Sequence, residues 1–421
     1  MYKFFGLLLF TFATLAVRAQ SYSLVIKGGT VIDPKNNINE VMDVAVADGK
    51  IARVAKDIDT RGALQVVDAH GMMVIPGMID MHTHVFFGTD PARAYCGGSA
   101  SVPPDVFGPR TGVTTVVDAG CSGWKDFPAF KHDVIDVSRT RVLAFINIVG
   151  GGMRSPYEQD LREMDGKMAG IVARQNKDII VGIKVAHYTG PEWTPVDQAL
   201  VAGKMANIPV MIDFGGNNPP LSIQELFFQH LRPGDIFTHC FGQLSSREFI
   251  VDTVTHTVKP FVREAQQRGI IFDVGYGEIS FAFSQAIPAI KSGFYPNSIS
   301  TDMHIHSMNQ AMRDLPNCMS KCLALGMPLH DVIQAVTWNP ARQIKHEELG
   351  HLSVGAVADI TILDLQKGKF GLYDYTGYRI EATQQFECMM TVRAGRIIYD
   401  LNGIAKPLVL PRPMPANGQT H

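Results

Sequence analysis

The chain has 421 residues, of which 46 % are hydrophobic and 19 % are charged, so it can bury a large globular core. Its 38 basic and 40 acidic residues give a formal net charge of −2. This balance leaves no basic field for nucleic acid, and we expect no nucleic-acid partner. The length allows roughly two or three domains, or a single α/β barrel with a small companion domain.

The N-terminus has the pattern of a secretory signal peptide. Lys3 precedes an apolar run over residues 4–17, and the small residues Val17 and Ala19 occupy the −3 and −1 positions of a cut after Ala19. The run is shorter than the ~20 residues that span a membrane, and no later segment resembles a membrane span. No cysteine follows the run, which argues against a lipoprotein. We expect residues 1–19 to be removed and the mature protein, secreted or periplasmic, to keep no membrane anchor.

The chain contains six cysteines, an even number that permits disulfides in an exported protein. Cys318 and Cys322 are spaced as neighbours on one helix face, where a bond between them would be strained. A domain of this size does not need disulfides for its stability. We therefore expect free, buried thiols.

Short strand patterns fill the segment before residue 78. They cover residues 23–30, 41–54 and 65–75, and Asp48-Gly49 inside the second pattern is a strong hairpin signal. We expect residues 20–77 to form one part of a small β domain.

The other part is predicted near the C-terminus. Residues 355–364 and 389–399 are again β-rich, with a turn at Ala394-Gly395 in the second segment. Two separated β segments around a long middle suggest one small domain, completed by residues 346–408. Residues 409–421 are rich in Pro, Asn and Gly, and we expect them to be a mobile tail.

The middle, residues 78–345, alternates strand and helix patterns. Successive strand ends lie about 31 residues apart, which matches the ~30 residues of a βα unit, and eight such units make a (β/α)8 barrel. The alternative is an open doubly wound sheet, which needs a glycine-rich phosphate turn after its first strand, and the sequence has none there. The candidate strands end near His84, Asp118, Asn147, Lys184, Asp213, His239, Asp273 and Asp302.

A pair of histidines ends the first of these strands. His82 and His84 are separated by one residue, so both side chains project to the same face of a strand. Two imidazoles on one face can chelate one metal ion. A chance His-x-His pair among fourteen histidines is the alternative, but its place at a strand end favours metal binding.

Three later strand ends carry residues that suit the same chemistry. Lys184 lies inside an apolar strand, where burial lowers its pKa and allows the neutral amine to form a carbamate with CO2. His239 and Asp302 close two further strands, and a carboxylate there can bind metal and shuttle a proton. The alternatives are a lysine that reaches outward, a core histidine and a helix N-cap.

The sequence resembles the amidohydrolase superfamily, closest to its amidohydrolase/deacetylase branch, over almost the whole chain after residue 20. The resemblance rests on residues 76–84, Lys184, His239, Ser300-Thr301-Asp302, and on residues 337–342 with 355–360. It implies a (β/α)8 barrel with a flanking β-sandwich, one or two divalent metals with zinc expected first, and hydrolysis of amide, cyclic amide or ester bonds. By motif, His82, His84 and Asp302 would hold the first metal, and carbamylated Lys184 would bridge to a second metal held by His239.

One position departs from the family pattern. The fifth strand usually ends in a histidine of the second metal, but this chain has Asp213. Aspartate is an acceptable zinc ligand, so the site can remain binuclear with Asp213 as a ligand. Alternatively Asp213 stays outside the coordination sphere and one metal binds.

Residues for substrate contact are suggested by position. His304 follows Asp302 at strand spacing, His187 lies three residues after Lys184, and Tyr276 stands at the exit of the seventh strand. Arg154, after a glycine run, could bind a substrate carboxylate. Cys121, at the end of the second strand, is a further candidate as a thiolate ligand of the metal.

These observations predict an exported, metal-dependent hydrolase acting on a small N-acyl or O-acyl molecule. Metal-bound hydroxide would attack the carbonyl, and Asp302 would pass the proton to the leaving group, with Lys184 as the second catalytic residue. The alternatives are a dihydroorotase-like cyclic amidase and a catalytically silent metal- or ligand-binding barrel. Family members are often oligomeric, which allows a homo-oligomer.

Overall fold

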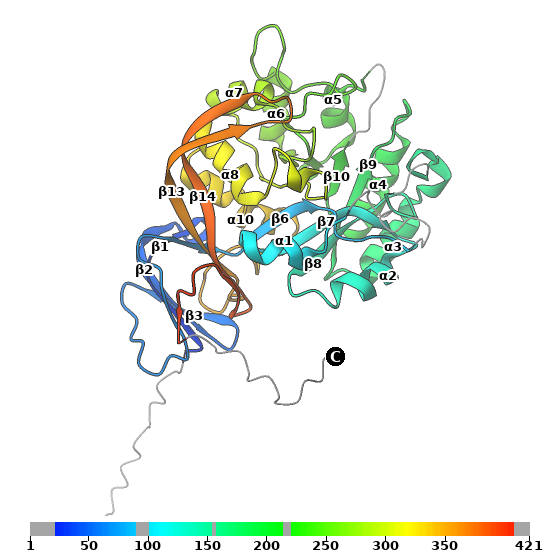
Figure 1. The fold of residues 1–421 in the computed structure, drawn as a ribbon. Helices are drawn as coiled ribbons and strands as arrows, with labels where there is room; N and C mark the ends of the chain where they lie inside the picture. Colours follow the sequence, from blue (N-terminus) through cyan, green and yellow to red (C-terminus); the bar gives the residue numbers. More distant parts are fainter. Residues whose placement is uncertain (1–21, 90–100, 154–156, 214–219, 408–421) are drawn as a thin grey trace, which may run out of the picture.

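The computed structural model describes residues 22–89, 101–153, 157–213 and 220–407, and these form two sheets with surrounding helices (Figure 1). The signal-peptide and tail predictions, Arg154 and Cys96 lie outside the described residues. The five cysteines that the structure describes are free and buried, as expected. Within the described ranges, no helix combines the length and apolar character needed to cross a membrane.

The first sheet is the predicted barrel. Its seven strands are parallel and neighbours in chain order, with side chains of Ile79, Val117, Phe145 and Met211 packed in its interior. Burying each such side chain stabilises the fold by about 1.5–3 kcal/mol. The strands are β6 (Met78–Thr83), β7 (Val113–Gly123), β8 (Arg141–Asn147), β9 (Ile180–Ala186), β10 (Val210–Asp213), β11 (Ile236–Phe237) and β12 (Ile271–Phe272).

The eighth predicted strand closes the barrel without becoming a regular strand. Parallel bridges join Asp273 to Ser298 on one side and Thr83 to Met303 on the other. The backbone turns into the left-handed region at Asp302, with φ of 51°, which interrupts the ladder at the site. The segment 298–303 therefore fills the eighth position between β12 and β6.

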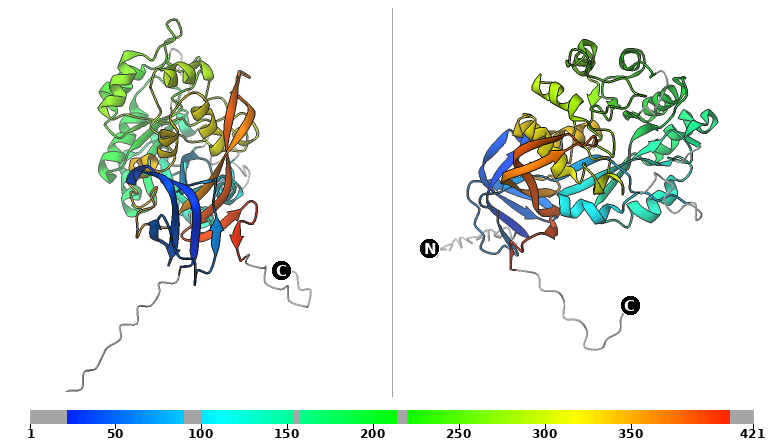
Figure 2. Two further views of the ribbon diagram at one scale, coloured as in Figure 1. Left: turned by 90° about the vertical axis from the view of Figure 1, so that its left-hand side faces the viewer. Right: turned by 45° about the horizontal axis from the view of Figure 1, so that its top comes forward.

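Helices lie around the outside of this sheet (Figure 2). Their starts follow local rules: the Asp165 carboxylate, for example, accepts hydrogen bonds from the backbone N–H groups of Lys167 and Met168 at the start of α3. The helices are α1 (Pro104–Thr111), α2 (Phe127–Phe130), α3 (Gly166–Gln175), α4 (Thr194–Ala206), α5 (Ile223–Glu225), α6 (Pro260–Arg268), α7 (Phe283–Lys291), α8 (Leu315–Ala324), α9 (Leu329–Gln334) and α10 (Trp338–Gln343).

The second sheet combines both ends of the described chain, as predicted. Both predicted turns are present, and Asp48, Gly49, Ala394 and Gly395 all have positive φ. The strand predicted over residues 65–75 is instead two separate strands, β4 and β5. The sheet order is β15-β14-β13-β5-β1-β2-β3, with β4 and β16 beside it. Its strands are β1 (Leu24–Asp33), β2 (Ile38–Ala47), β3 (Lys50–Ala55), β4 (Val66–Asp68), β5 (Met73–Pro76), β13 (Ile360–Tyr373), β14 (Arg379–Arg393), β15 (Arg396–Asp400) and β16 (Ala405–Lys406).

Strands β13 and β14 extend well beyond the predicted β segments and form a long hairpin that reaches the barrel (Figure 1). At its far end the Asp374 carboxylate accepts a hydrogen bond from the Phe283 backbone N–H, and the Tyr375 hydroxyl donates to the Gln243 carbonyl. Along its length, the Phe386 backbone N–H donates to the Ser320 hydroxyl of α8. The hairpin thus fixes the segment that follows β11.

Candidate metal centre and active site

Six predicted ligand residues meet at the carboxyl ends of the barrel strands. All six are buried, and five of them form two groups of potential metal ligands that share His82, while Lys184 lies beside His82 and Asp213. This is the end at which barrel enzymes place their active sites. The residues are His82, His84, Lys184, Asp213, His239 and Asp302.

The first group consists of His82, His84 and Asp302. The Asp302 Oδ1 atom lies 2.8 Å from His84 Nε2 and 3.6 Å from His82 Nε2. A tetrahedral zinc ion with bonds of about 2.0–2.1 Å separates its ligand atoms by about 3.3 Å. The donor atoms are therefore of the right type and close to the right spacing for one divalent ion.

The second group consists of His82, Asp213 and His239. His239 Nε2 lies 3.1 Å from Asp213 Oδ2, and Lys184 Nζ lies 3.6 Å from the same oxygen and 2.9 Å from His82 Nε2. Lys184 therefore lies between the two groups, where a carbamate on its nitrogen could contact both. Burial lowers the pKa of Lys184, although Asp213, Asp302 and Asp273 oppose this shift. A lowered pKa favours the neutral amine that reacts with CO2.

Hydrogen bonds to the rings fix which nitrogen each histidine offers to the site. His239 Nδ1 donates to the Gly275 carbonyl at 2.5 Å, so its Nε2 carries the lone pair. His82 Nδ1 lies 2.9 Å from the Thr238 hydroxyl, which itself donates to the Asp273 carboxylate at 2.8 Å. With the hydroxyl hydrogen committed to Asp273, His82 Nδ1 is the donor. Both rings thus present Nε2 to the cluster, as in metal sites with outer partners.

The titratable groups of the first cluster are in the forms that bind metal. Burial and the nearby Lys184 lower the pKa of His82 to about 3, so its imidazole is neutral. Burial alone would raise the pKa of Asp302, but His82, His304 and His84 lower it well below its usual value. Asp302 is therefore an ionised carboxylate at neutral pH.

Three residues at the site have left-handed backbone conformations. The φ angles are 57° at His239, 51° at Asp302 and 58° at His187. Such conformations cost about 1–3 kcal/mol each for residues with a Cβ and are concentrated at functional sites. The strain at these positions supports the assignment of this end of the barrel as the active site.

Cys121 contacts the His84 ring on the side that faces away from the ligand group. Its Sγ atom is 3.2 Å from Nδ1 of His84, on the side of the ring away from Asp302 Oδ1, which faces Nε2. Burial and the neighbouring Asp118 raise the pKa of the Cys121 thiol well above its usual value. Because Sγ faces Nδ1 while the ligand group faces Nε2, Cys121 is placed to orient the His84 ring.

Two of the predicted substrate-contact residues reach the site. His304 Nδ1 donates to the Asp302 carbonyl at 2.7 Å, and the His304 ring centre lies 6.0 Å from that of His84. His187 Nδ1 lies 3.1 Å from the Glu158 carboxylate, and its Nε2 lies 4.0 Å from Asp213 Oδ2. Both rings are therefore held by one nitrogen beside the metal-ligand candidates.

Tyr276 does not reach the site. Its side chain is fully buried, and its hydroxyl accepts a hydrogen bond from Lys321 Nζ at 2.8 Å and donates to the Tyr373 carbonyl at 3.2 Å. Its ring stacks on Phe281 at 4.3 Å between centres. The structure thus places Tyr276 in the packing between the barrel, α8 and the β13–β14 hairpin.

The family follows from comparisons with known proteins. A model of the amidohydrolase family matches residues 281–398. A deacetylase of Brucella anthropi is 35 % identical over 348 residues, which cover 81 % of this chain and 83 % of that protein. The chain belongs to the amidohydrolase family. A deacetylase of Enterococcus faecalis is 30 % identical and covers 90 % of this chain and 99 % of its own length.

Solved structures agree with this membership. A crystal structure described as an adenine deaminase has a TM-score of 0.81 and 29 % identity, and covers 90 % of this chain and 100 % of its own. One described as a dihydroorotase has a TM-score of 0.77 and 31 % identity, with coverage of 90 % and 99 %. This amidohydrolase is accordingly a hydrolase by family, and its clustered histidines and aspartates suit the divalent metals that the family generally binds.

One residue of this amidohydrolase site, Arg247, could not be identified from the sequence. Arg247 lies on the segment after β11, and its Nη2 atom is 2.5 Å from Asp213 Oδ1. No strand end or motif marks this position, because the segment has no regular secondary structure. Thr238 and Asp273, which orient His82, stood at predicted strand ends and could have been found there.

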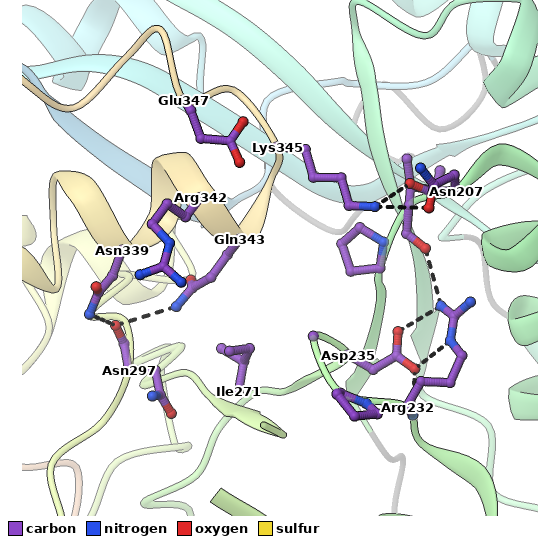
Figure 3. Close-up of a pocket in the computed structure, with 14 residues that line it drawn as sticks. Asn207, Arg232, Asp235, Ile271, Asn297, Asn339, Arg342, Gln343, Lys345 and Glu347 are labelled. Carbon is purple, nitrogen blue, oxygen red and sulfur yellow. Dashed lines mark hydrogen bonds and ion pairs between the residues drawn. The ribbon is translucent and has the colours of Figure 1, made fainter. Parts of the chain in front are cut away.

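The cavity in Figure 3 is separate from this centre. It is lined at the amino ends of the strands by the segments before β10 and β11 and by Ile271 of β12, together with Asn297, α10 and the residues that follow α10. Its polar groups largely satisfy one another: Lys345 Nζ donates to Asn207, and Arg232 pairs with Asp235. The amino end of a barrel serves stability, so we do not place chemistry there.

Proposed function

We propose that this protein is a metal-dependent hydrolase that removes an acyl group from a small N-acyl or O-acyl molecule. The observation that carries the proposal is the pair of ligand groups sharing His82 at the carboxyl end of the barrel. In this proposal His82, His84 and Asp302 hold one divalent ion, and His239, Asp213 and carbamylated Lys184 hold a second. Such ions, zinc being the expected one, supply an activated water molecule and polarise the carbonyl.

The protein's own residues would handle the proton and the substrate. Asp302 is ionised and buried beside His82 and His84, so it can take the proton of the attacking water and deliver it to the leaving amine or alcohol. His187 Nε2 lies 4.0 Å from Asp213 Oδ2, beside the second ligand group, where it can hydrogen-bond the substrate. His304 contacts Asp302 through Nδ1 and directs Nε2 toward the Glu278 carboxylate, at 4.0 Å. In this proposal Asp302 transfers the proton and His187 orients the substrate.

The acyl-transfer proposal is supported by the relatives that match over most of their length. Deacetylases of Brucella anthropi and Enterococcus faecalis align over 81 % and 90 % of this chain. The match to the dihydroorotase of Pelotomaculum thermopropionicum covers only 15 % of the chain, whereas the solved structure described as a dihydroorotase covers 90 % of it, so a cyclic amidase is the alternative. We also propose that the protein is exported after cleavage behind Ala19, a setting that does not suit a cytoplasmic pyrimidine enzyme.

A substrate panel tests the proposal. Zinc-loaded protein would be incubated with N-acetyl amino acids, O-acetyl hydroxy acids, dihydroorotate and adenine, while released acetate, ring opening and ammonia are measured separately. We expect acetate release, and we expect Asp302→Asn to lose it while the protein stays folded. Turnover of dihydroorotate or adenine alone would contradict the acyl assignment. No turnover of any compound by metal-loaded protein would favour the catalytically silent barrel.

A further inference from the structure

The two oxygens of the Asp213 carboxylate face different partners. Oδ1 lies 2.5 Å from Arg247 Nη2, while Oδ2 lies 3.1 Å from His239 Nε2 and 3.6 Å from Lys184 Nζ. His187 Nε2 is also on the Oδ2 side, at 4.0 Å. Arg247 therefore leaves one oxygen free for a metal ion, and Asp213 can act only as a monodentate ligand.

This ion pair is shielded from solvent. The Asp213 side chain is 4 % exposed and the Arg247 side chain 17 %. At such burial salt screens an ion pair little, so the positive charge of Arg247 acts strongly on the Asp213 carboxylate. The Nε atom of Arg247 is buried and has no hydrogen-bond partner among the described residues. Exposed ion pairs usually contribute little to the energy of a site, but this pair is buried and does not belong to that class.

The segment that carries Arg247 is anchored on both sides. The Glu248 carboxylate accepts hydrogen bonds from the Ile223 backbone N–H and from Lys259 Nζ, both at 2.8 Å. The Gln243 carbonyl accepts the Tyr375 hydroxyl of the β13–β14 hairpin at 3.0 Å. The guanidinium is therefore held against Asp213 and does not depend on a flexible loop for its position.

The two metal positions consequently differ in charge. Asp302 of the first position forms its ion pairs with histidines alone among the described residues, so it brings a full negative charge. At the second position the charge of Asp213 is cancelled by Arg247. Any carbamate on Lys184 lies between both positions and does not remove this difference. A divalent ion should thus bind the first position more tightly than the second.

We propose that Arg247 is a positioning residue that presents one oxygen of Asp213 to the second metal and weakens that metal's binding by neutralising the carboxylate. This inference rests on the proposed function, because it requires a second metal position. It predicts two unequal affinities in the wild-type protein, a tight one and a weak one. It further predicts that removing the guanidinium charge strengthens only the weak one.

Titration with Zn²⁺ against a chromophoric chelator tests the inference. The metal-free wild-type protein should take up one ion tightly and a second weakly. Arg247→Gln should tighten the weak step about tenfold or more and leave the tight step unchanged, because one nearby positive charge is lost. Arg247→Lys keeps the charge and should bind like the wild type. Should Arg247→Gln fail to fold, Arg247→Met removes the same charge and carries the same expectation.

A matched control is available at the other end of the barrel. Arg232 forms a similar ion pair with Asp235, at 2.7 Å, and Arg232→Gln should lower the melting temperature without changing either binding step. If Arg247→Gln also lowers only the melting temperature, or if it weakens the second step, the inference is wrong. A wild-type protein that takes up no Zn²⁺ would instead contradict the proposed function itself.

Discussion

The hydroxyl of Thr238 offers a sharp test of how the site orients its shared histidine. It accepts a hydrogen bond from His82 Nδ1 at 2.9 Å and donates one to the Asp273 carboxylate at 2.8 Å, and all three side chains are buried. Thr238→Val keeps the shape of the side chain but removes both hydrogen bonds. Asp273 retains the hydroxyls of Ser298 and Ser300, each at 2.7 Å, so the loss falls mainly on His82.

An unpaired buried donor costs about 1–3 kcal/mol, which corresponds to about 10–100-fold in affinity where it orients a metal ligand. We therefore expect Thr238→Val to bind Zn²⁺ about 10–100-fold more weakly than the wild type, measured by competition with a chelator. Thr361→Val is the control, since its buried hydroxyl donates to the Gly112 carbonyl at 2.6 Å far from the site. The control should lose stability in urea but keep its zinc affinity. Unchanged zinc affinity in Thr238→Val would refute the role of this hydrogen-bond chain.

Further predictions concern other positions. Lys184→Ala should abolish turnover and lower the metal content, and added short carboxylic acids should partly restore activity. Unchanged activity in this variant would contradict a carbamate on Lys184. Asp213→Ala should lose about one equivalent of metal. Asp213→His removes the negative charge that pairs with Arg247 and makes the site more positive, which lowers the pKa of metal-bound water. Measurements of rate against pH should therefore show the acid limb at lower pH in Asp213→His. Burial lowers the pKa of Lys321 to about 8 from 10.5, so the folded state binds fewer protons above pH 8. Relative to Lys321→Met, the wild type should therefore gain up to about 3 kcal/mol of stability between about pH 8 and 10.5, and a flat difference in urea unfolding would contradict this. The exported protein should begin at Gln20, and N-terminal sequencing that finds Met1 on periplasmic protein would exclude cleavage.

Local signals account for the parts of the fold that the sequence predicted. The hairpins at Asp48-Gly49 and Ala394-Gly395 need only residues that accept positive φ, and the barrel follows from strands recurring at a constant interval. The long β13–β14 hairpin was not predicted beyond residue 364. Its extension depends on contacts with α7, α8 and the segment after β11, and no local pattern encodes these.

The same distinction holds at the site. Strand ends place the Cα atoms of His82, Lys184 and Asp213 near one another, so their convergence could be inferred from spacing alone. The direction of a side chain after a turn could not. Between Gly275 and Gly277, which both have positive φ, Tyr276 turns into the packing against Lys321. Arg247 was missed because its segment is positioned by tertiary hydrogen bonds.

Anomalous X-ray diffraction at the zinc edge, from crystals of protein loaded with zinc, would locate the metal ions directly. We expect one strong peak within bonding distance of His82, His84 and Asp302. A second, weaker peak should lie beside His239 and Asp213 Oδ2, with continuous density from Lys184 Nζ between the two. The absence of a peak at His82, His84 and Asp302, or peaks only elsewhere on the molecule, would contradict a metal-dependent hydrolase built on these residues.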